Sequence, residues 1–282
     1  MEQKWTYEIK PKTKLFDLQL REIWKYRDLI WLFVKRDFTT RFKQTILGPT
    51  WFIIQPLFTA AMQAFVFGDI ANMKLPVSGV SHFLFYMVGN VPWMYFSTCL
   101  TNTSNTFVQN ANVFGKVYFP RMTIPISSVI SSMVNFVVQM LLVILFSILF
   151  LFRGSNAHLT WAVLLTPILV IQMAMLGLGF GIIISSMTTK YRDLQVMVSF
   201  GVQLWMYATP VIYAASTLSD NLYTLIMLNP MSPIVEFMRY GWLGVGDQPF
   251  FFWGISWITT IVVLFIGITM FNKVEKTFMD TV

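Results

Sequence analysis

Residues 109–125 read QNANVFGKVYFPRMTIP and form a short polar and basic stretch between two long segments that carry no charge. Asp, Glu, Lys and Arg are absent from residues 75–115 and from residues 122–152, and only Lys116 and Arg121 stand between these segments. A helix needs roughly 20 apolar residues to cross the hydrocarbon of a bilayer. We therefore predict that residues 109–125 are a loop between two spanning helices, and the two cations predict a cytoplasmic position for it.

The composition excludes an ordinary soluble domain. Of the 282 residues, 56% are hydrophobic and only 12% are charged, and the mean hydropathy is +0.62, which is typical of a polytopic membrane protein. The net charge of +7 does not indicate a nucleic-acid partner, because 11 of the 20 Lys and Arg lie before residue 48 and signal orientation and lipid headgroups instead. The single cysteine, Cys99, excludes a disulfide within the chain and a thiolate metal cluster.

The N-terminal region, residues 1–48, is predicted to be cytoplasmic and to contain an amphipathic helix over residues 14–47. Apolar residues recur there at spacings of three, four or seven, with charged residues between them. Because these charges forbid spanning, we predict that the helix lies in the membrane interface. Its cations Arg36, Arg41 and Lys43 would then face lipid phosphates. A helix of a cytosolic bundle is the alternative for this segment.

Six spanning helices are predicted within residues 49–271, at about 49–68, 81–106, 125–152, 159–187, 194–213 and 250–271. The fourth contains Gly177, Gly179 and Gly181, with Ser185 one turn on, which predicts a face of small residues that allows another helix to approach closely. Residues 214–248 contain two apolar runs that are too short to span and are separated by prolines. This pattern predicts a pair of re-entrant or interfacial helices on the outer side, before the last span.

The distribution of charge predicts the topology. With these six spans, 17 of the 20 Lys and Arg lie on the inner side, including those of the tail, residues 272–282. This asymmetry favours an arrangement with both termini in the cytoplasm. The fold class predicted is therefore an all-α polytopic membrane protein with six transmembrane helices.

The predicted spans offer little chemistry for catalysis. No acidic residue lies inside them, although membrane enzymes and ion-coupled carriers need polar groups at that depth. The two histidines have no acids at metal-ligand spacing, and Glu236 with Arg239 fits an ion pair within one short helix. Gly115-Lys116 lacks the upstream glycine and the following Ser or Thr of a phosphate-binding loop. We therefore expect no catalytic residue, no metal and no cofactor on this chain.

Aromatic residues are abundant, at 17% of the chain. Aromatic faces stack on sugar rings, but they also form interface belts and lipid-facing surface, so both interpretations stay open for each residue. The candidates for a translocation pathway are Trp51, Phe52, Tyr86, Trp93, Tyr95, Trp205 and Tyr207.

Four motifs together resemble those of a known family. They are RDFTTRFKQTILGPTWFIIQPL at residues 36–57, NANVFGKVYFPRMTIPIS at 110–127, TTKYRDLQ at 188–195, and ATPVIY at 208–213 followed by LNPMSPIVEFMRY at 228–240. This arrangement resembles the membrane subunits of type-2 ABC exporters. Within them it is most similar to the permeases that export O-antigen, teichoic-acid and capsule polysaccharides.

The resemblance implies an assembly and a coupling site. Two permease subunits would face each other in a homodimer, and two copies of a separate cytoplasmic ATPase subunit would bind ATP and Mg²⁺. The loop between the second and third spans would dock on the ATPase, and the second inner loop would border the ATPase or the inner gate. The residues implied in this coupling are Asn112, Phe114, Lys116, Val117, Tyr118, Phe119, Pro120, Arg121, Tyr191, Arg192 and Asp193.

The function implied is export of a lipid-linked polysaccharide across the bacterial inner membrane. Arg36, Arg41 and Lys43 would attract the lipid pyrophosphate where the amphipathic helix meets the first span. Three alternatives remain: an ABC exporter of a small molecule or drug, a membrane glycosyltransferase or acyltransferase that acts alone, and a structural scaffold.

Overall fold

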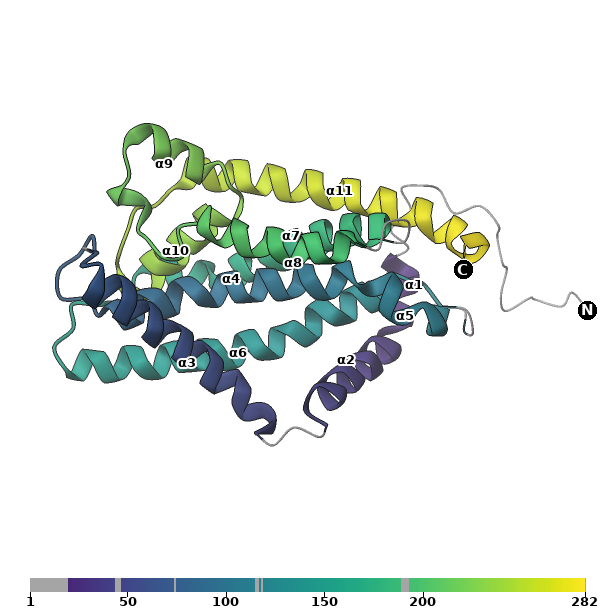
Figure 1. Cartoon of the computed structure of the whole chain (residues 1–282), viewed down its shortest axis with the longest axis horizontal. Coiled ribbons are helices and arrows are strands. Elements are labelled where there is room, and N and C mark those ends of the chain that lie inside the picture. The colour runs from purple at the N-terminus through teal and green to yellow at the C-terminus, as the bar shows by residue number, and fades with distance from the viewer. Residues whose placement is uncertain are drawn as a thin grey trace, which may run out of the picture.

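The computed structural model describes residues 20–43, 47–73, 75–114, 117, 119–188 and 193–281. These residues form helices and no strands, which confirms the predicted all-α class (Figure 1). In chain order the elements are α1 (Leu20–Lys25), α2 (Arg27–Phe42), η1 (Gly48–Thr50), α3 (Trp51–Gln63), η2 (Ala64–Ile70), α4 (His82–Ser104), α5 (Thr106–Phe114), α6 (Thr123–Phe152), η3 (Trp161–Leu165), α7 (Thr166–Thr188), α8 (Leu194–Tyr207), η4 (Ala215–Thr217), α9 (Asp220–Met227), α10 (Met231–Leu243) and α11 (Phe250–Thr281).

The long helices run along the long axis of the molecule, and the short ones gather at its two ends (Figure 1). α9 and α10 lie at one end. α1, α2 and α5 lie toward the other end, together with the last turns of α11. The described part of the 109–125 loop and the C-terminal end of α11 are therefore on the same side of the bundle, as the charge distribution predicts.

Four helical segments are long and apolar enough to cross a membrane: residues 48–70, 123–152, 161–188 and 250–274. They confirm a polytopic membrane protein and correspond to four of the six predicted spans. α8 has only 14 residues because the chain turns after Tyr207, so the helix ends earlier than the predicted boundary at residue 213. α4 is long enough at 23 residues, but Asn90, Asn102 and several hydroxyl residues lower its hydropathy.

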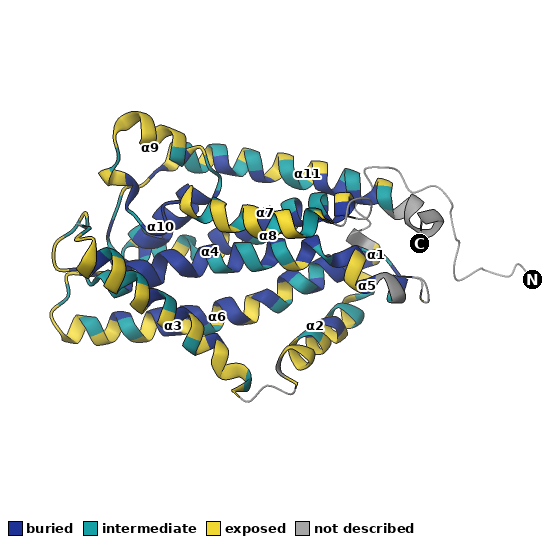
Figure 2. Cartoon of the chain, viewed as in Figure 1, coloured by how far each residue is buried: buried dark blue, intermediate teal, exposed yellow. Residues whose placement is uncertain are grey.

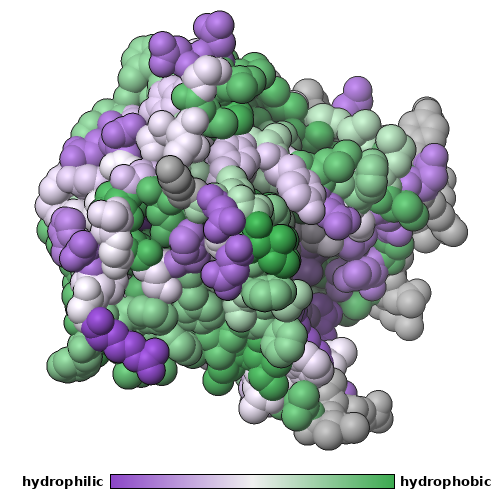
Figure 3. Space-filling view, turned by 60° about the vertical axis from the view of Figure 1, so that its left-hand side comes forward, coloured by the Kyte–Doolittle hydropathy of each residue, from purple (hydrophilic) through white to green (hydrophobic). Residues whose placement is uncertain are grey.

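α4 is the central helix of the bundle. Most of its side chains are buried, and it contacts α3, α6, α7 and α10 (Figure 2). Its buried residues Leu84, Phe85 and Phe96 belong to the larger hydrophobic core. The other long helices surround α4 and expose their outer surfaces. Because α4 is buried on most sides, it needs no polar face. Figure 3 brings the end with α9 and α10 forward and shows hydrophilic side chains gathered there, with hydrophobic surface around them.

The glycines of α7 allow close contact with two helices. A Cβ atom at Gly177 would lie 2.7 Å from Cys99 Cβ, and one at Gly181 would lie 2.5 Å from Thr103 Cβ, both on α4. Gly179 faces α11 instead, where a Cβ at Gly267 would lie 2.7 Å from the Gly179 carbonyl oxygen. The predicted close approach is confirmed, but the small residues serve two opposite faces rather than one.

Of the helix predicted over residues 14–47, the described residues form two helices, α1 and α2. Within the described residues the helix breaks at Tyr26, where φ is −95° and ψ is 20°, and α2 ends at Phe42. Ile23, Phe33 and Val34 are buried against the bundle, whereas Trp24 and Trp31 are exposed. One apolar face thus packs on protein, and the interfacial position of the exposed aromatic residues stays a prediction.

A buried ion pair holds the end of the molecule that carries α10. Arg239 donates hydrogen bonds from Nη1 to the Pro210 and Tyr213 carbonyls and from Nη2 to the Val211 carbonyl, at 2.5, 3.1 and 2.5 Å. It also contacts Glu236 Oε1 at 3.2 Å, which confirms the predicted intrahelical pair. Its guanidinium carbon lies 3.8 Å from the centre of the Phe85 ring, so one side chain joins α10, the chain after α8, and α4.

We expect Arg239→Ala to lower the free energy of unfolding by about 3–5 kcal/mol, because it leaves Glu236 as a buried and unpaired charge. Thermal unfolding of the purified protein in detergent measures this change. Arg153→Ala is the matched control, since Arg153 is an exposed cation directly after α6, and this end of α6 lies at the same end of the molecule as α10 (Figure 1). Equal melting temperatures for the two variants would contradict a stabilising role for Arg239.

Replacing glycine by alanine should have opposite effects on stability at a packed glycine, Gly181, and at a glycine with free space around it, Gly201. Gly181→Ala should destabilise the protein by about 1–3 kcal/mol, because the added methyl group forces α7 away from α4. Gly201→Ala should leave stability unchanged or raise it by up to about 1 kcal/mol, because nothing lies within 4 Å of a Cβ there. Unfolding curves of both variants against the parent protein test the difference, and a destabilised Gly201→Ala would contradict it.

Candidate functional site

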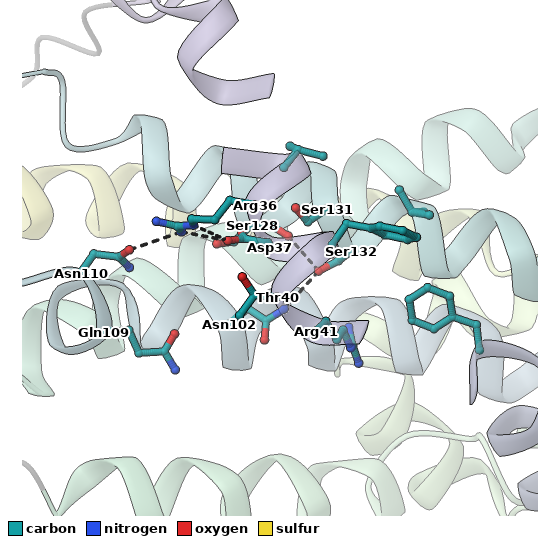
Figure 4. A pocket seen from close by; sticks show the side chains of 14 residues that line it. Arg36, Asp37, Thr40, Arg41, Asn102, Gln109, Asn110, Ser128, Ser131 and Ser132 are labelled. Carbon is teal, nitrogen blue, oxygen red and sulfur yellow. Dashed lines mark hydrogen bonds and ion pairs between the residues drawn. The ribbon is translucent and has the colours of Figure 1, made fainter. Parts of the chain in front are cut away.

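A pocket of about 470 Å³ lies between α2 and the ends of α3, α4, α5 and α6 that are close to the 109–125 loop (Figure 4). This volume is within the range of small-molecule sites. Its walls combine two guanidinium groups, one carboxylate, neutral polar side chains and a few apolar ones. The lining residues are Val34, Arg36, Asp37, Phe38, Thr40, Arg41, Phe52, Asn102, Gln109, Asn110, Ser128, Ser131, Ser132 and Val134.

Arg36 is held from three directions. Its Nη2 donates to Asp37 Oδ1 at 2.8 Å and to Asn110 Oδ1 at 3.4 Å, and its guanidinium carbon lies 4.7 Å from the centre of the Phe33 ring. The contact with Asn110 joins α2 to α5 across the pocket (Figure 4). Arg36 is therefore oriented before any ligand binds.

Arg41 has fewer partners. Its guanidinium carbon lies 5.3 Å from the centre of the Phe52 ring on α3, and within the described residues it has no carboxylate partner. Lys43 is exposed directly after α2 and does not line the pocket. Of the three predicted phosphate-binding residues, the structure thus brings Arg36 and Arg41 together on one pocket.

The side of the pocket opposite α2 is neutral and polar. We call Asn102, Gln109, Ser128, Ser131 and Ser132 the polar wall. Asn102 Nδ2 lies 3.4 Å from Ser132 Oγ, and Ser132 Oγ donates to the Ser128 carbonyl at 2.8 Å. None of these residues is among those predicted from the sequence, because uncharged Asn, Gln and Ser stand out less in an apolar span than a charged residue does. The spacing of residues 128, 132, 135 and 139, all Ser, Asn or Gln on α6, was the available signal.

The loop that follows α5 packs against α2. We call its aromatic surroundings the loop cluster, in which the Phe33 and Phe119 ring centres lie 5.7 Å apart and those of Phe114 and Phe119 lie 5.8 Å apart. Arg121 lies over the Phe114 ring, with 5.6 Å between the guanidinium carbon and the ring centre. The buried members are Ile23, Phe33, Phe107, Phe114, Phe119, Met122, Ile124, Ile182, Ile268 and Phe271.

The predicted coupling residues divide into buried and exposed ones. Phe114 and Phe119 are only 3% and 5% exposed, whereas Val117 between them is 60% exposed. Pro120 and Arg121 are half-buried, and Asp193 is exposed immediately before α8. The side chains of the other five residues lie outside the described part of the chain: Asn112, Lys116, Tyr118, Tyr191 and Arg192.

The predicted pathway aromatics also divide. Phe52, Tyr86, Trp93 and Tyr95 are buried within the subunit. Trp205 is partly buried, with its ring centre 6.3 Å from that of Trp93, and its Nε1 donates to Asn229 Oδ1 at 3.0 Å. Trp51 and Tyr207 are exposed. Of the seven candidates, Trp51 and Tyr207 are thus the two whose rings are exposed on the surface of the subunit. A role in a translocation pathway stays a prediction for all seven.

The chain is similar to a protein family and to curated proteins of known name. Residues 28–243 match the family described as ABC-2 type transporter. The O-antigen export system permease protein RfbA of Klebsiella pneumoniae is 28% identical over 253 residues, which cover 90% of this chain and 94% of that protein. The protein of the same name from Myxococcus xanthus is 29% identical over 220 residues, or 78% and 80% of the two chains. This chain therefore belongs to the ABC-2 type transporter family.

Proposed function

We propose that this chain is the permease subunit of an ABC exporter that moves a lipid-linked polysaccharide of the O-antigen type outward across the bacterial inner membrane. Two copies of a separate ATPase would bind ATP with Mg²⁺ and supply the energy. The observation that carries the proposal is the pocket, which places Arg36 and Arg41 beside neutral hydrogen-bonding groups and next to the coupling loop. The names of the similar proteins support the same substrate class.

The pyrophosphate of the carrier lipid would bind between Arg36 and Arg41. A guanidinium forms short charge-assisted hydrogen bonds with phosphate oxygens. Arg36 is already oriented by Asp37 and Asn110, and Arg41 keeps its charge available because it packs on the Phe52 ring and has no carboxylate partner among the described residues. Lys43, exposed at the end of α2, would attract the lipid at longer range.

The 109–125 loop would transmit the movement of the ATPase. Phe114 and Phe119 are buried against the bundle and α2, so we assign them the role of holding the loop in place. Val117 is exposed between them and is the described residue best placed to enter a groove on the ATPase. Since Phe119 packs on Phe33 of α2, a displacement of the loop would also move the cations of the pocket.

Polar stripes on two helices support a homodimer with a polar passage. Gln55, Thr59 and Gln63 recur every fourth residue on α3, and Gln195, Ser199 and Gln203 do so on α8. All six residues are exposed or half-buried on the subunit. Gln63 Oε1 accepts a hydrogen bond from Asn90 Nδ2 on α4, at 2.5 Å. Amide groups facing hydrocarbon cost roughly 2–7 kcal/mol. The two stripes would therefore face water and a second permease copy.

Both stripes lie beside α4 at the same depth. Gln63 contacts Asn90 of α4, and Trp205 of α8 packs on Trp93 of α4, one turn further on. α3 and α8 thus flank α4, and Figure 2 shows exposed residues on both. The exposed Trp51 and Tyr207 belong to these same helices and would border the passage.

We expect Arg41→Gln to raise the concentration of undecaprenyl pyrophosphate-linked glycan needed for half-maximal ATP hydrolysis by the permease–ATPase complex about 10–100-fold. This corresponds to the loss of one charged hydrogen bond. Lys25→Gln is the control, because Lys25 is an exposed cation on α1 that does not line the pocket. Stimulation of the parent complex by a small amphipathic drug but not by the glycan lipid would instead favour the small-molecule exporter.

The coupling role of the loop predicts a specific effect of charge at residue 117. Val117→Asp should weaken association with the ATPase at least about tenfold, because it places an unpaired carboxylate in the contact. Val117→Thr, of similar size and without charge, should stay within about twofold. Co-purification of the two subunits and ATP-driven export measure the effect. Normal association of Val117→Asp would show that the ATPase docks elsewhere.

A further inference from the structure

The two arginines explain only one side of the pocket. Asn102, Gln109 and Ser131 on the opposite side are uncharged, so they add little attraction for a pyrophosphate beyond ordinary hydrogen bonds. Amide and hydroxyl groups both donate and accept hydrogen bonds. A ligand that satisfies this side must therefore offer neutral donors and acceptors, next to the charged groups that meet α2.

The polar wall has hydrogen-bonding capacity left over. Among described residues Ser131 Oγ is buried without a partner. Gln109 is exposed, and its backbone N–H donates to the Asn105 carbonyl, which leaves its side-chain amide facing the pocket. Asn102 uses its Nδ2 group on Ser132 Oγ, and its carbonyl oxygen has no donor there. Buried polar groups in native proteins are normally paired, so the Ser131 hydroxyl lacks an expected partner. The amides of Asn102 and Gln109 are exposed and free to bind a ligand in place of water.

Polar side chains deeper in the same helix behave differently. Asn135 and Gln139 of α6 continue the spacing of Ser128 and Ser132, and they are 9% and 1% exposed. Gln139 Nε2 donates to Asn135 Oδ1 at 3.2 Å. These two amides thus satisfy each other as part of the bundle. Ser147 Oγ further along α6 is also unpaired, but it does not line the pocket, whereas Ser128, Ser131 and Ser132 do.

The apolar lining fits the same ligand class. Phe38 and Phe52 line the pocket together with the polar wall, and their ring centres lie 6.5 Å apart. A sugar ring has hydroxyl groups at its edge and C–H groups on its faces, and aromatic rings pack well against such apolar faces. An acyl chain would satisfy the aromatic rings but would leave the amides and hydroxyls without partners, at a cost.

We infer that the polar wall binds the hydroxyl groups of the sugar attached directly to the pyrophosphate, so that one pocket recognises the phosphate and the first sugar together. This inference rests on the proposed function and adds a basis for substrate selection to it. The two halves of the pocket meet at Asn110, which accepts a hydrogen bond from Arg36 and directly follows Gln109. A sugar linked to a phosphate on Arg36 would lie toward the wall (Figure 4).

The experiment compares lipids with and without the sugar. The permease–ATPase complex is reconstituted in liposomes, and ATP hydrolysis is titrated with bare undecaprenyl pyrophosphate and with a panel that carries one hexose or one N-acetylhexosamine. At least one sugar-bearing lipid should act at a concentration about tenfold lower than the bare lipid, because a site built for hydroxyl groups discriminates against a ligand that lacks them. Equal concentrations for all the lipids would overturn the inference.

Variants of the wall then separate sugar recognition from phosphate recognition. The double variant Asn102→Leu with Ser131→Ala should reduce the preference for the sugar-bearing lipid to within about twofold, because it should raise the concentration needed of that lipid more than the concentration needed of the bare lipid. Gln109 is exposed on α5, so Gln109→Leu should fold normally. It should also reduce the preference for the sugar-bearing lipid, and it replaces the double variant in the test if the double variant does not fold. Ser147→Ala is the matched control, because it removes an unpaired serine hydroxyl further along α6 and should preserve the preference.

Failure of the inference can be distinguished from failure of the proposed function. Arg41→Gln should weaken the response to both lipids equally. If it does so while the wall variants keep the full preference, the sugar site is refuted and the exporter with its pyrophosphate site stands. If the wall variants weaken the two lipids equally, the wall does not read the sugar and the inference is also refuted. If Arg41→Gln changes neither response, the proposed pyrophosphate site is refuted.

Discussion

The close contact between α4 and α7 determines where the other helices of this protein can lie. In a lipid environment apolar surfaces gain little from leaving the solvent, so helices associate through close packing and interhelical hydrogen bonds. Gly177 and Gly181 let α7 approach the backbone of α4, and Gly179 with Gly267 repeats this contact between α7 and α11. α4 is then enclosed by α3, α6, α7 and α10. Its polar side chains therefore form hydrogen bonds with neighbouring helices, and they can meet a ligand only near the ends of α4.

The position of the pocket follows from this arrangement. Asn102 lies in the last turns of α4, beyond the enclosed part of the helix, and faces Ser132 of α6. α2 closes the pocket from the other side and is anchored by the contact between Phe33 and Phe119. Phe33 and Arg36 are one helical turn apart, so the same turn of α2 contacts both the coupling loop and the pocket. Under the proposed function, substrate binding and ATPase docking would thereby be linked through this turn of α2.

Much of the fold is readable from the sequence, because hydropathy and proline positions mark the long helices within a few residues. The spacing of Glu236 and Arg239 also identifies their ion pair. The pocket is harder to predict, since Arg36, Asn102 and Ser132 are brought together by packing across about 100 residues. The burial of the aromatic residues in the 109–125 loop also depends on a segment far away in the sequence, because Phe119 packs on Phe33 of α2. The composition of this loop resembles that of an exposed docking motif. Phe114 and Phe119 are nevertheless buried, because they pack against apolar side chains of the bundle.

Two arginines show how burial and partners separate structural from ligand-binding charge. Both Arg239 and Arg41 lie over phenylalanine rings, at 3.8 and 5.3 Å from the ring centres. Arg239 is fully buried, and its two terminal nitrogens donate to three backbone carbonyls and a carboxylate, so its charge is compensated within the protein and closed off from a ligand. Arg41 is exposed beside a cavity, and its charge is compensated by no described carboxylate. A bound phosphate would therefore gain most at Arg41, where the protein itself leaves the cation uncompensated.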